Sequence, residues 1–169
     1  MYRGSTKEHS DPLMRTYLED LIYRLSETSE VRDRRFEFII LEDKTINAFA
    51  APGGIIGINL GMFLNTEREG ELASVMCHEL AHLSQRHFAR SQNRNSPLAN
   101  ALMILGSIAV AAASRNPEAI LIAPAAMQQM SINYTRSNEK EADRIGFNNL
   151  VKAGFDPNDM TMMFQRMQD

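Results

Sequence analysis

The segment from Glu67 to Ser91 reads EREGELASVMCHELAHLSQRHFARS and determines how the rest of the chain can be arranged. Its apolar side chains recur with helical period, at Leu72, Val75, Met76, Leu80 and Leu83. This period predicts one long helix over the segment. Within it, His78 and His82 are four residues apart, so they share one helix face and both imidazoles can reach a single metal ion.

The acid that follows the first histidine has a different position on this helix. Glu79 lies about 100° round the helix from His78, so its carboxylate would stand beside a water on the metal and not on the metal itself. Zinc lowers the pKa of such a water toward about 7, and a nearby carboxylate can take its proton as the water attacks a carbonyl. The five residues His78-Glu79-Leu80-Ala81-His82 therefore indicate hydrolytic chemistry.

A hydrolytic zinc needs a third protein ligand and an open fourth position. A third histidine is available only at His9 or His87. His87 is five residues past His82, and on a continuous helix it would point to the opposite side. His9 sits in a polar N-terminal stretch without periodic support. Neither is a good ligand candidate.

An acidic ligand on another helix is a better choice. The run Asn138-Glu139-Lys140-Glu141-Ala142-Asp143 offers three carboxylates. Glu139 and Asp143 share a face by their four-residue spacing, while Glu141 is expected to face away. One of the pair can bind zinc and the other can accept the outer N–H of a ligand histidine. Spacing alone leaves open which acid does which.

The remaining patterns predict an α+β fold of zincin-like type. A helix is expected to begin at Asp11-Pro12, and another should run from Asn133 to Ala153 and stop at Gly154. Short apolar, β-prone runs predict strands at 36–41, 46–50 and 55–59. The last two flank the turn signal Pro52-Gly53-Gly54 and should form a hairpin. We expect a mainly helical domain with a small, mostly antiparallel sheet packed beside the helix of the two histidines.

The length and composition of the chain limit its number of domains and its possible classes of function. The 169 residues suffice for one domain, and a net charge of -3 with no basic stripe argues against nucleic-acid binding. The single cysteine, Cys77, excludes an intrachain disulfide and is expected to be a small packing residue. We predict a flexible segment over 1–10 and a catalytic domain over 11–169. The polar start predicts either a cytoplasmic protein or a removed export signal, and the helix that stops at Asp169 predicts a longer natural protein.

Residues 98–113 form an unusual stretch, without charge and with only Asn100 and Ser107 as polar side chains. As a helix, the stretch would cover about 24 Å, less than the roughly 30 Å hydrocarbon core of a bilayer. A buried core hairpin is therefore the favoured interpretation, ahead of peripheral contact with a membrane surface. A full membrane span is the least favoured.

Three motifs in order and spacing resemble the Ste24-type zinc metallopeptidases, which are gluzincins, and most closely their bacterial periplasmic branch. The motifs are INAFAAPGG at 46–54, the His78–His82 run followed by Arg86-His87, and NEKEADRIG at 138–146. The resemblance covers nearly the whole chain, from about Asp11 to Pro157. It implies one Zn2+ per chain, held by His78, His82 and Glu139, with Glu79 as catalytic base and Asp143 as partner of a zinc-bound histidine.

The resemblance also suggests how substrate would bind and where the protein works. A strand at Asn47, Ala48 and Phe49 would be an edge strand that receives an extended polypeptide by strand addition. The expected activity is endopeptidase cleavage of misfolded or unassembled proteins in the periplasm, with outer-membrane β-barrel proteins as candidate substrates and residues 98–113 as a candidate membrane contact. Members of this branch usually carry a C-terminal repeat region, which this sequence lacks.

A second interpretation belongs to a different functional class. The apolar residues 98–113 and the apparent truncation would also suit a chaperone-like module that binds outer-membrane protein precursors, with a structural or gated zinc site.

Overall fold

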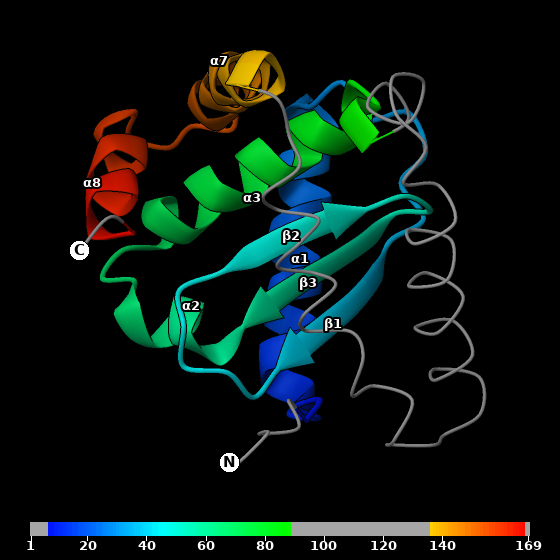
Figure 1. The fold of residues 1–169 in the computed structure, drawn as a ribbon, viewed down its shortest axis with the longest axis vertical. Coiled ribbons are helices and arrows are strands. Elements are labelled where there is room, and N and C mark those ends of the chain that lie inside the picture. Colours follow the sequence, from blue (N-terminus) through cyan, green and yellow to red (C-terminus); the bar gives the residue numbers. More distant parts are fainter. Residues whose placement is uncertain (1–6, 89–135, 168–169) are drawn as a thin grey trace.

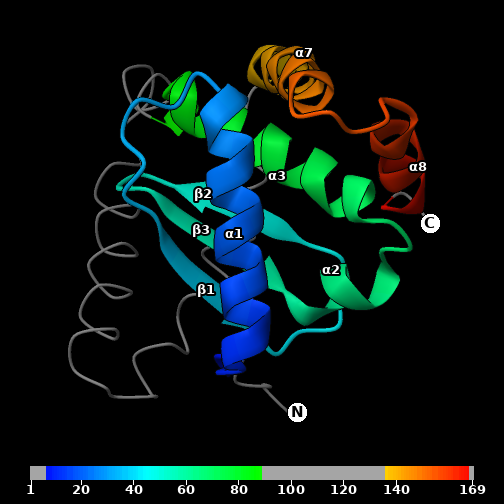
Figure 2. The same cartoon turned by 180° about the vertical axis from the view of Figure 1, so that it is seen from behind.

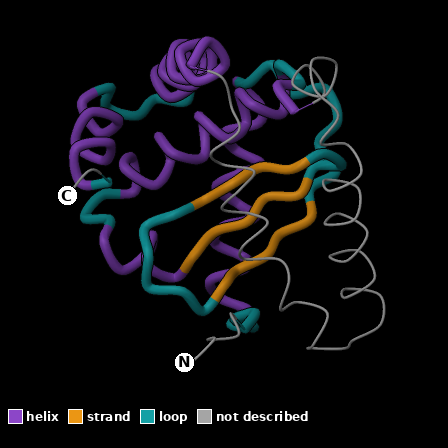
Figure 3. The backbone as a smooth tube through the Cα atoms, in the orientation of Figure 1, coloured by secondary structure: helices purple, strands orange, loops and turns teal. Residues whose placement is uncertain are grey.

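The structure, a computed structural model, describes residues 7–88 and 136–167, and Figure 1 shows how their elements are arranged. In chain order the elements are α1 (Pro12–Thr28), β1 (Glu37–Leu41), β2 (Ala48–Ala51), β3 (Ile55–Asn59), α2 (Leu60–Asn65), α3 (Glu69–Ser84), α7 (Arg136–Lys152) and α8 (Asn158–Arg166). One helix precedes the three strands in the sequence and the other described helices follow them, and helices and strands lie in separate parts of the structure (Figure 3). The α+β fold class is confirmed. The segment 98–113 lies outside the described residues, among which no helix combines the length and apolarity that crossing a membrane requires.

The three strands form one sheet in the order β1-β3-β2. The predicted hairpin is present, because β2 pairs antiparallel with β3. Gly53 and Gly54 in its turn have φ of 89° and 81°, values that glycine adopts readily. However, β1 pairs with β3 and runs parallel to it. The sheet is therefore mixed, and the expectation of a mostly antiparallel sheet needs correction. The physical reason is that β3 inserts between β1 and β2 after the chain has reversed twice.

Helices cover the sheet in layers. Helix α1 crosses the back of the sheet (Figure 2), α3 lies beside β2, and α7 and α8 pack against α3 (Figure 1). Side chains along each strand point alternately to the two faces of the sheet, and one of these faces packs against the described helices. The helix-facing core includes Leu18, Leu21, Ile22, Leu25, Phe38, Ile40, Ile56, Ile58, Met76 and Leu80. Burial of these apolar side chains holds α3 in a fixed position relative to β2.

The start of the first helix agrees with the prediction, whereas the segment before it does not. The predicted start of α1 is confirmed, since the Asp11 carboxylate caps the helix by accepting from the backbone N–H groups of Leu13 and Met14. The segment 1–10 was predicted to be flexible, but its described part contacts the sheet. Glu8 forms an antiparallel bridge with Leu41, and the backbone N–H of His9 donates to the carbonyl of Ile40. These hydrogen bonds fix residues 8 and 9 against β1.

The end of the central helix also departs from the prediction. A single helix was expected to reach Ser91, but α3 ends at Ser84. Arg86 then takes a positive φ of 51°, which is uncommon for a residue other than glycine and breaks the helical path. The chain turns there before His87, so the side chain of His87 does not follow the direction that a continuous helix would give it.

Cys77 is a packing residue, as predicted. It is fully buried, Nδ2 of Asn149 lies 3.4 Å from its sulfur, and burial raises the pKa of its thiol to about 12. Asn149 also donates to the carbonyl of Leu25 and accepts from the hydroxyl of Thr28. One amide side chain on α7 thus connects α1 and α3.

We expect Cys77 to resist thiol reagents in the native protein, because reagent cannot reach a fully buried sulfur. At pH 8, labelling by a disulfide reagent should be roughly 100-fold or more slower in the folded chain than in urea. The urea sample, which should give one thiol per chain, is the control. Equal labelling rates in the two samples would contradict the burial of this residue.

Candidate active site

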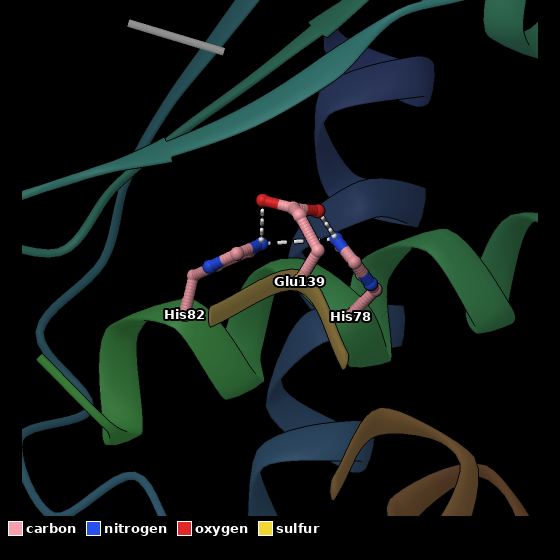
Figure 4. Close-up of side chains that lie close together, drawn as sticks. All are labelled: His78, His82 and Glu139. Atoms are coloured by element: carbon pink, nitrogen blue, oxygen red, sulfur yellow. Dashed lines mark hydrogen bonds and ion pairs between the residues drawn. The ribbon is translucent and has the colours of Figure 1, made fainter. Parts of the chain in front are cut away.

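The three predicted metal ligands meet at one point, although they come from two helices. His78 and His82 project from α3, and Glu139 reaches them from α7 (Figure 4). Nε2 of His78 lies 2.9 Å from Nε2 of His82. Oε2 of Glu139 is 3.4 Å from Nε2 of His78, and its Oε1 is 3.6 Å from Nε2 of His82. The ligand atoms all lie within 4.8 Å of one another.

This triangle of donor atoms fits a tetrahedral metal ion. With metal–ligand bonds of about 2.0–2.1 Å, two ligand atoms of a tetrahedron are roughly 3.3 Å apart. The separation of the two imidazole nitrogens and the two histidine–carboxylate separations, which end on different oxygens of Glu139, lie on both sides of that value. Oε1 of Glu139 is buried and has no hydrogen-bond partner among the described residues. A buried carboxylate oxygen that faces two imidazole nitrogens is suited to a cation.

The charges around the first histidine favour a cation as well. Burial alone would lower the pKa of His78, but the carboxylates of Asp143, Glu139 and Glu79 outweigh it and raise this pKa to about 10. At Glu139, burial would raise the pKa of the carboxyl, but the two histidines outweigh this effect and lower the pKa to about 2. The same surplus of negative charge that holds a proton on His78 would favour a divalent metal ion.

Asp143 lies behind His78. Its Oδ1 is 2.9 Å from Nδ1 of this histidine, on the side away from the other ligands. The two groups are placed as an ion pair, and Asp143 contributes to the raised pKa of His78. The ring of Phe164, on α8, stands edge-on to His78 with 5.9 Å between the ring centroids. An acid and an aromatic ring thus limit the orientation of this imidazole.

Glu79 lies between the ligand helix and the edge of the sheet. It is 9% exposed, and burial raises the pKa of its carboxyl. Positive charge on His78 and His82 and a hydrogen bond with the backbone of Ala50 act in the opposite direction without cancelling the effect of burial. A raised pKa suits a carboxylate that has to take up a proton near neutral pH.

The close approach of α3 and α7 explains a glycine in the third motif. A Cβ atom on Gly146 would lie 2.9 Å from the backbone nitrogen of His78 and 3.0 Å from its Cα. These are contacts with backbone atoms, which cannot swing aside as a side chain can. Only glycine therefore lets α7 come near enough to α3 for Glu139 and Asp143 to reach the histidines.

His87 and Glu141 belong to the site, although the sequence pattern did not place them there. Nδ1 of His87 is 2.8 Å from Nδ1 of His82, and its Nε2 is 2.8 Å from Oε2 of Glu141. His87 was expected to point away from the ligand histidines and Glu141 to face away from the site. The expectation for His87 was wrong because it assumed that the helix continues through Arg86. Glu141 does lie on another face of α7 than Glu139, and it joins the site because His87 contacts it. The Arg86-His87 pair in the second motif was the available signal.

Ala48 and Phe49 begin β2, which is an edge strand among the described strands, and Asn47 immediately precedes it. The carbonyl of Asn47 accepts from the N–H of Asn59, so its backbone faces β3. The side chain of Phe49 covers Gly57 on the face of the sheet away from the helices. The role of the three residues in substrate binding stays a prediction.

Comparison with known proteins agrees with this geometry. Residues 12–168 match Peptidase family M48, and the chain belongs to that family of metallopeptidases. It is 44% identical to a putative beta-barrel assembly-enhancing protease of Vibrio cholerae, over 100% of this chain and 36% of the relative. It is 38% identical to the beta-barrel assembly-enhancing protease of Escherichia coli K12, over 99% of this chain and 35% of that protein.

A more distant relative comes from mitochondria. The mitochondrial metalloendopeptidase OMA1 of Schizosaccharomyces pombe is 28% identical, over 98% of this chain and 49% of its own length. The chain thus spans about a third of the length of its bacterial relatives. The resemblance to a metallopeptidase family that was predicted from three motifs is confirmed, including the similarity to the beta-barrel assembly-enhancing protease, and the zincin-like fold class is confirmed with it.

We expect Gly146→Ala to destabilise the domain and to weaken metal binding, because the added methyl group would push α7 away from His78. Overpacking should lower the free energy of unfolding by about 1–3 kcal/mol. The higher helix propensity of alanine should offset roughly 1 kcal/mol of this loss. Urea unfolding and competition with a zinc chelator measure the two effects. Asn148→Ala, at an exposed position of the same helix, is the matched control. Unchanged zinc affinity in the glycine variant would count against the packing argument.

Proposed function

We propose that this chain is the catalytic domain of a zinc-dependent endopeptidase that cleaves internal bonds of misfolded or unassembled proteins. The observation that carries the proposal is the convergence of His78, His82 and Glu139 within 4.8 Å, with a buried Glu79 next to the first histidine. Family membership points to the same chemistry. Zn2+ is the metal proposed, because two imidazoles and one carboxylate are a common ligand set of catalytic zinc sites.

Each residue has a distinct part in this proposal. When bound, zinc would lower the pKa of a water molecule toward about 7 and polarise the scissile carbonyl. The two histidines and Glu139 would hold the ion, and Asp143 would orient His78. Glu79 takes a proton from the attacking water and passes it to the nitrogen of the leaving amine, so it returns to its ionised form at the end of the cycle.

The backbone of β2 is the proposed receiver of the substrate. In an antiparallel pair, residues that exchange hydrogen bonds alternate with residues whose N–H and C=O groups face the other side. Since Asn47 is bonded to Asn59, the register places Phe49 toward β3 and leaves the backbone groups of Ala48 and Ala50 on the outer edge. An extended polypeptide could pair with that edge beside Glu79. Of the three residues predicted from the sequence, Ala48 is therefore the one proposed to bond substrate directly.

The cellular setting is also a proposal. The bacterial relatives are named for enhancing β-barrel assembly, which supports outer-membrane β-barrel proteins as substrates and the periplasm as the compartment. Residues 98–113 remain a candidate for peripheral membrane contact. A chaperone-like module with a structural or gated zinc is less favoured, since the chain has a complete set of ligands and a base, and its relatives are named as proteases.

Glu79→Gln is the first test of the proposed chemistry. The variant should still bind one zinc per chain, because Glu79 is not a ligand, but its cleavage of casein should fall by roughly 10²–10⁴-fold since the amide cannot take up a proton. Metal analysis and release of casein fragments are the measurements. Glu27→Gln, an exposed acid on α1, is the matched control. Casein cleavage by Glu79→Gln at the unsubstituted rate would refute the proposal.

Ala48→Pro tests the proposed substrate edge. Proline removes an N–H that faces outward, so pairing with β3 should persist, while strand addition by substrate should be impaired. We expect kcat/KM for an extended peptide to fall at least about tenfold, equivalent to one hydrogen bond of about 1.4 kcal/mol. Zinc affinity and the melting temperature serve as controls for folding. A folded, zinc-loaded variant with unchanged kcat/KM would exclude Ala48 as a substrate contact.

A further inference from the structure

The second metal ligand, His82, is backed by two residues to which the proposed zinc chemistry assigns no part. We infer that His87 and Glu141 form a hydrogen-bonded relay that fixes the tautomer and the ring orientation of His82. They are positioning residues and touch neither metal nor substrate. This inference rests on the proposed function in one respect, namely that His82 binds the metal through Nε2.

The direction of each hydrogen bond in the relay follows from that one requirement. If Nε2 of His82 presents its lone pair to a metal, the ring proton must be on Nδ1. Nδ1 then donates across the 2.8 Å to Nδ1 of His87, which must accept and so carries no proton. The proton of His87 is therefore on Nε2, which donates across 2.8 Å to Oε2 of Glu141. An ionised carboxylate only accepts, so the chain of donors ends there.

The burial of the two histidines makes the positions of their ring protons important. His87 is fully buried and His82 is 4% exposed. If His87 carried its proton on Nδ1 instead, two N–H groups would face each other inside the protein. Turning the ring of His82 to relieve that conflict would move its Nε2 away from the other metal ligands, and turning the ring of His87 would break its contact with Glu141. With a metal on Nε2 of His82, a single arrangement of protons agrees with the His82–His87 and His87–Glu141 contacts.

The geometry of the two helices explains why an imidazole intervenes. His78 is backed directly by a carboxylate, Asp143, which is one turn beyond Glu139 on α7. Glu141 lies about 200° round α7 from Glu139, so its carboxylate does not point directly toward His82. The turn at Arg86, with its positive φ, returns the chain so that His87 occupies the space between them. The two histidine ligands on α3 are therefore supported differently. A carboxylate contacts His78 directly, whereas an imidazole stands between His82 and its carboxylate.

The tautomer of His87 is directly measurable in the zinc-loaded chain. The sequence has only four histidines, so their long-range nitrogen–proton NMR correlations can be assigned by linking each ring to the sequential backbone assignment of the unsubstituted chain. We expect His82 to be protonated on Nδ1 and His87 on Nε2. His87 protonated on Nδ1 in the zinc-loaded protein would overturn the inference. This measurement needs no substitution in the relay, so it does not depend on whether a variant folds.

Zinc affinity gives a second readout. His87→Leu and Glu141→Leu should each weaken zinc binding about 10- to 100-fold in competition with a chelator. The double variant should be no weaker than His87→Leu, since Glu141 acts only through His87. His87→Asn, which keeps an acceptor near the position of Nδ1, should recover part of the affinity. The His9 and Glu42 pair, 3.3 Å apart beside β1, provides matched controls as His9→Leu and Glu42→Leu, which should bind zinc normally.

The outcomes separate this inference from the proposed function. An unsubstituted chain that binds no zinc would reject the proposed function itself. A chain that binds zinc, with folded His87→Leu equal to it in affinity, would reject only the relay. Additive losses in the double variant would also reject it, because they would show that Glu141 acts independently of His87.

Discussion

The contact between α3 and α7 at Gly146 is the constraint on which the rest of the site depends. Without a side chain at this position, the backbone of α7 reaches the backbone of α3 next to His78. The acids that follow from this approach, Glu139 on the ligand side and Asp143 behind the ring, are one helical turn apart. The ligand set is therefore a product of helix packing, and no loop has to be held in place to complete it.

The opposite side of α3 is fixed by the sheet. Helix α1 and the helix-facing strand residues bury the apolar positions of α3, which sets its height above β2. Glu79 consequently meets the backbone of Ala50. The base and the edge strand thus share one local contact, so a shift of β2 along its own axis would change the surroundings of the base. Packing in the core and chemistry at the surface of the sheet are connected through this strand.

Sequence reasoning found those parts of the site that depend on helical period. The spacing of His78 and His82, and of Glu139 and Asp143, puts each pair on one face whatever the rest of the fold does. The division of roles between the two acids could not be derived from spacing, because it depends on the direction in which α7 crosses α3. It came from the resemblance to a family.

Other parts followed from tertiary structure and had no periodic signal. Arg86 takes a positive φ without being glycine, so nothing in the pattern marked the end of α3, and the position of His87 was consequently misjudged. The parallel pairing of β1 depends on β3 inserting between two strands that are consecutive in the chain. A local pattern shows that a strand exists, but its neighbours are decided by the whole sheet.

The placement of the ligands also has a consequence for the chain between them. His78 and His82 precede residues 83–138 in the sequence and Glu139 follows them, so a bound metal would join α3 to α7 across these residues. Such an ion would act as a cross-link, and the entropy of closing a chain segment in this way depends only weakly on the length of the segment. The stabilisation that the cross-link gives would therefore change little with the number of residues between His82 and Glu139.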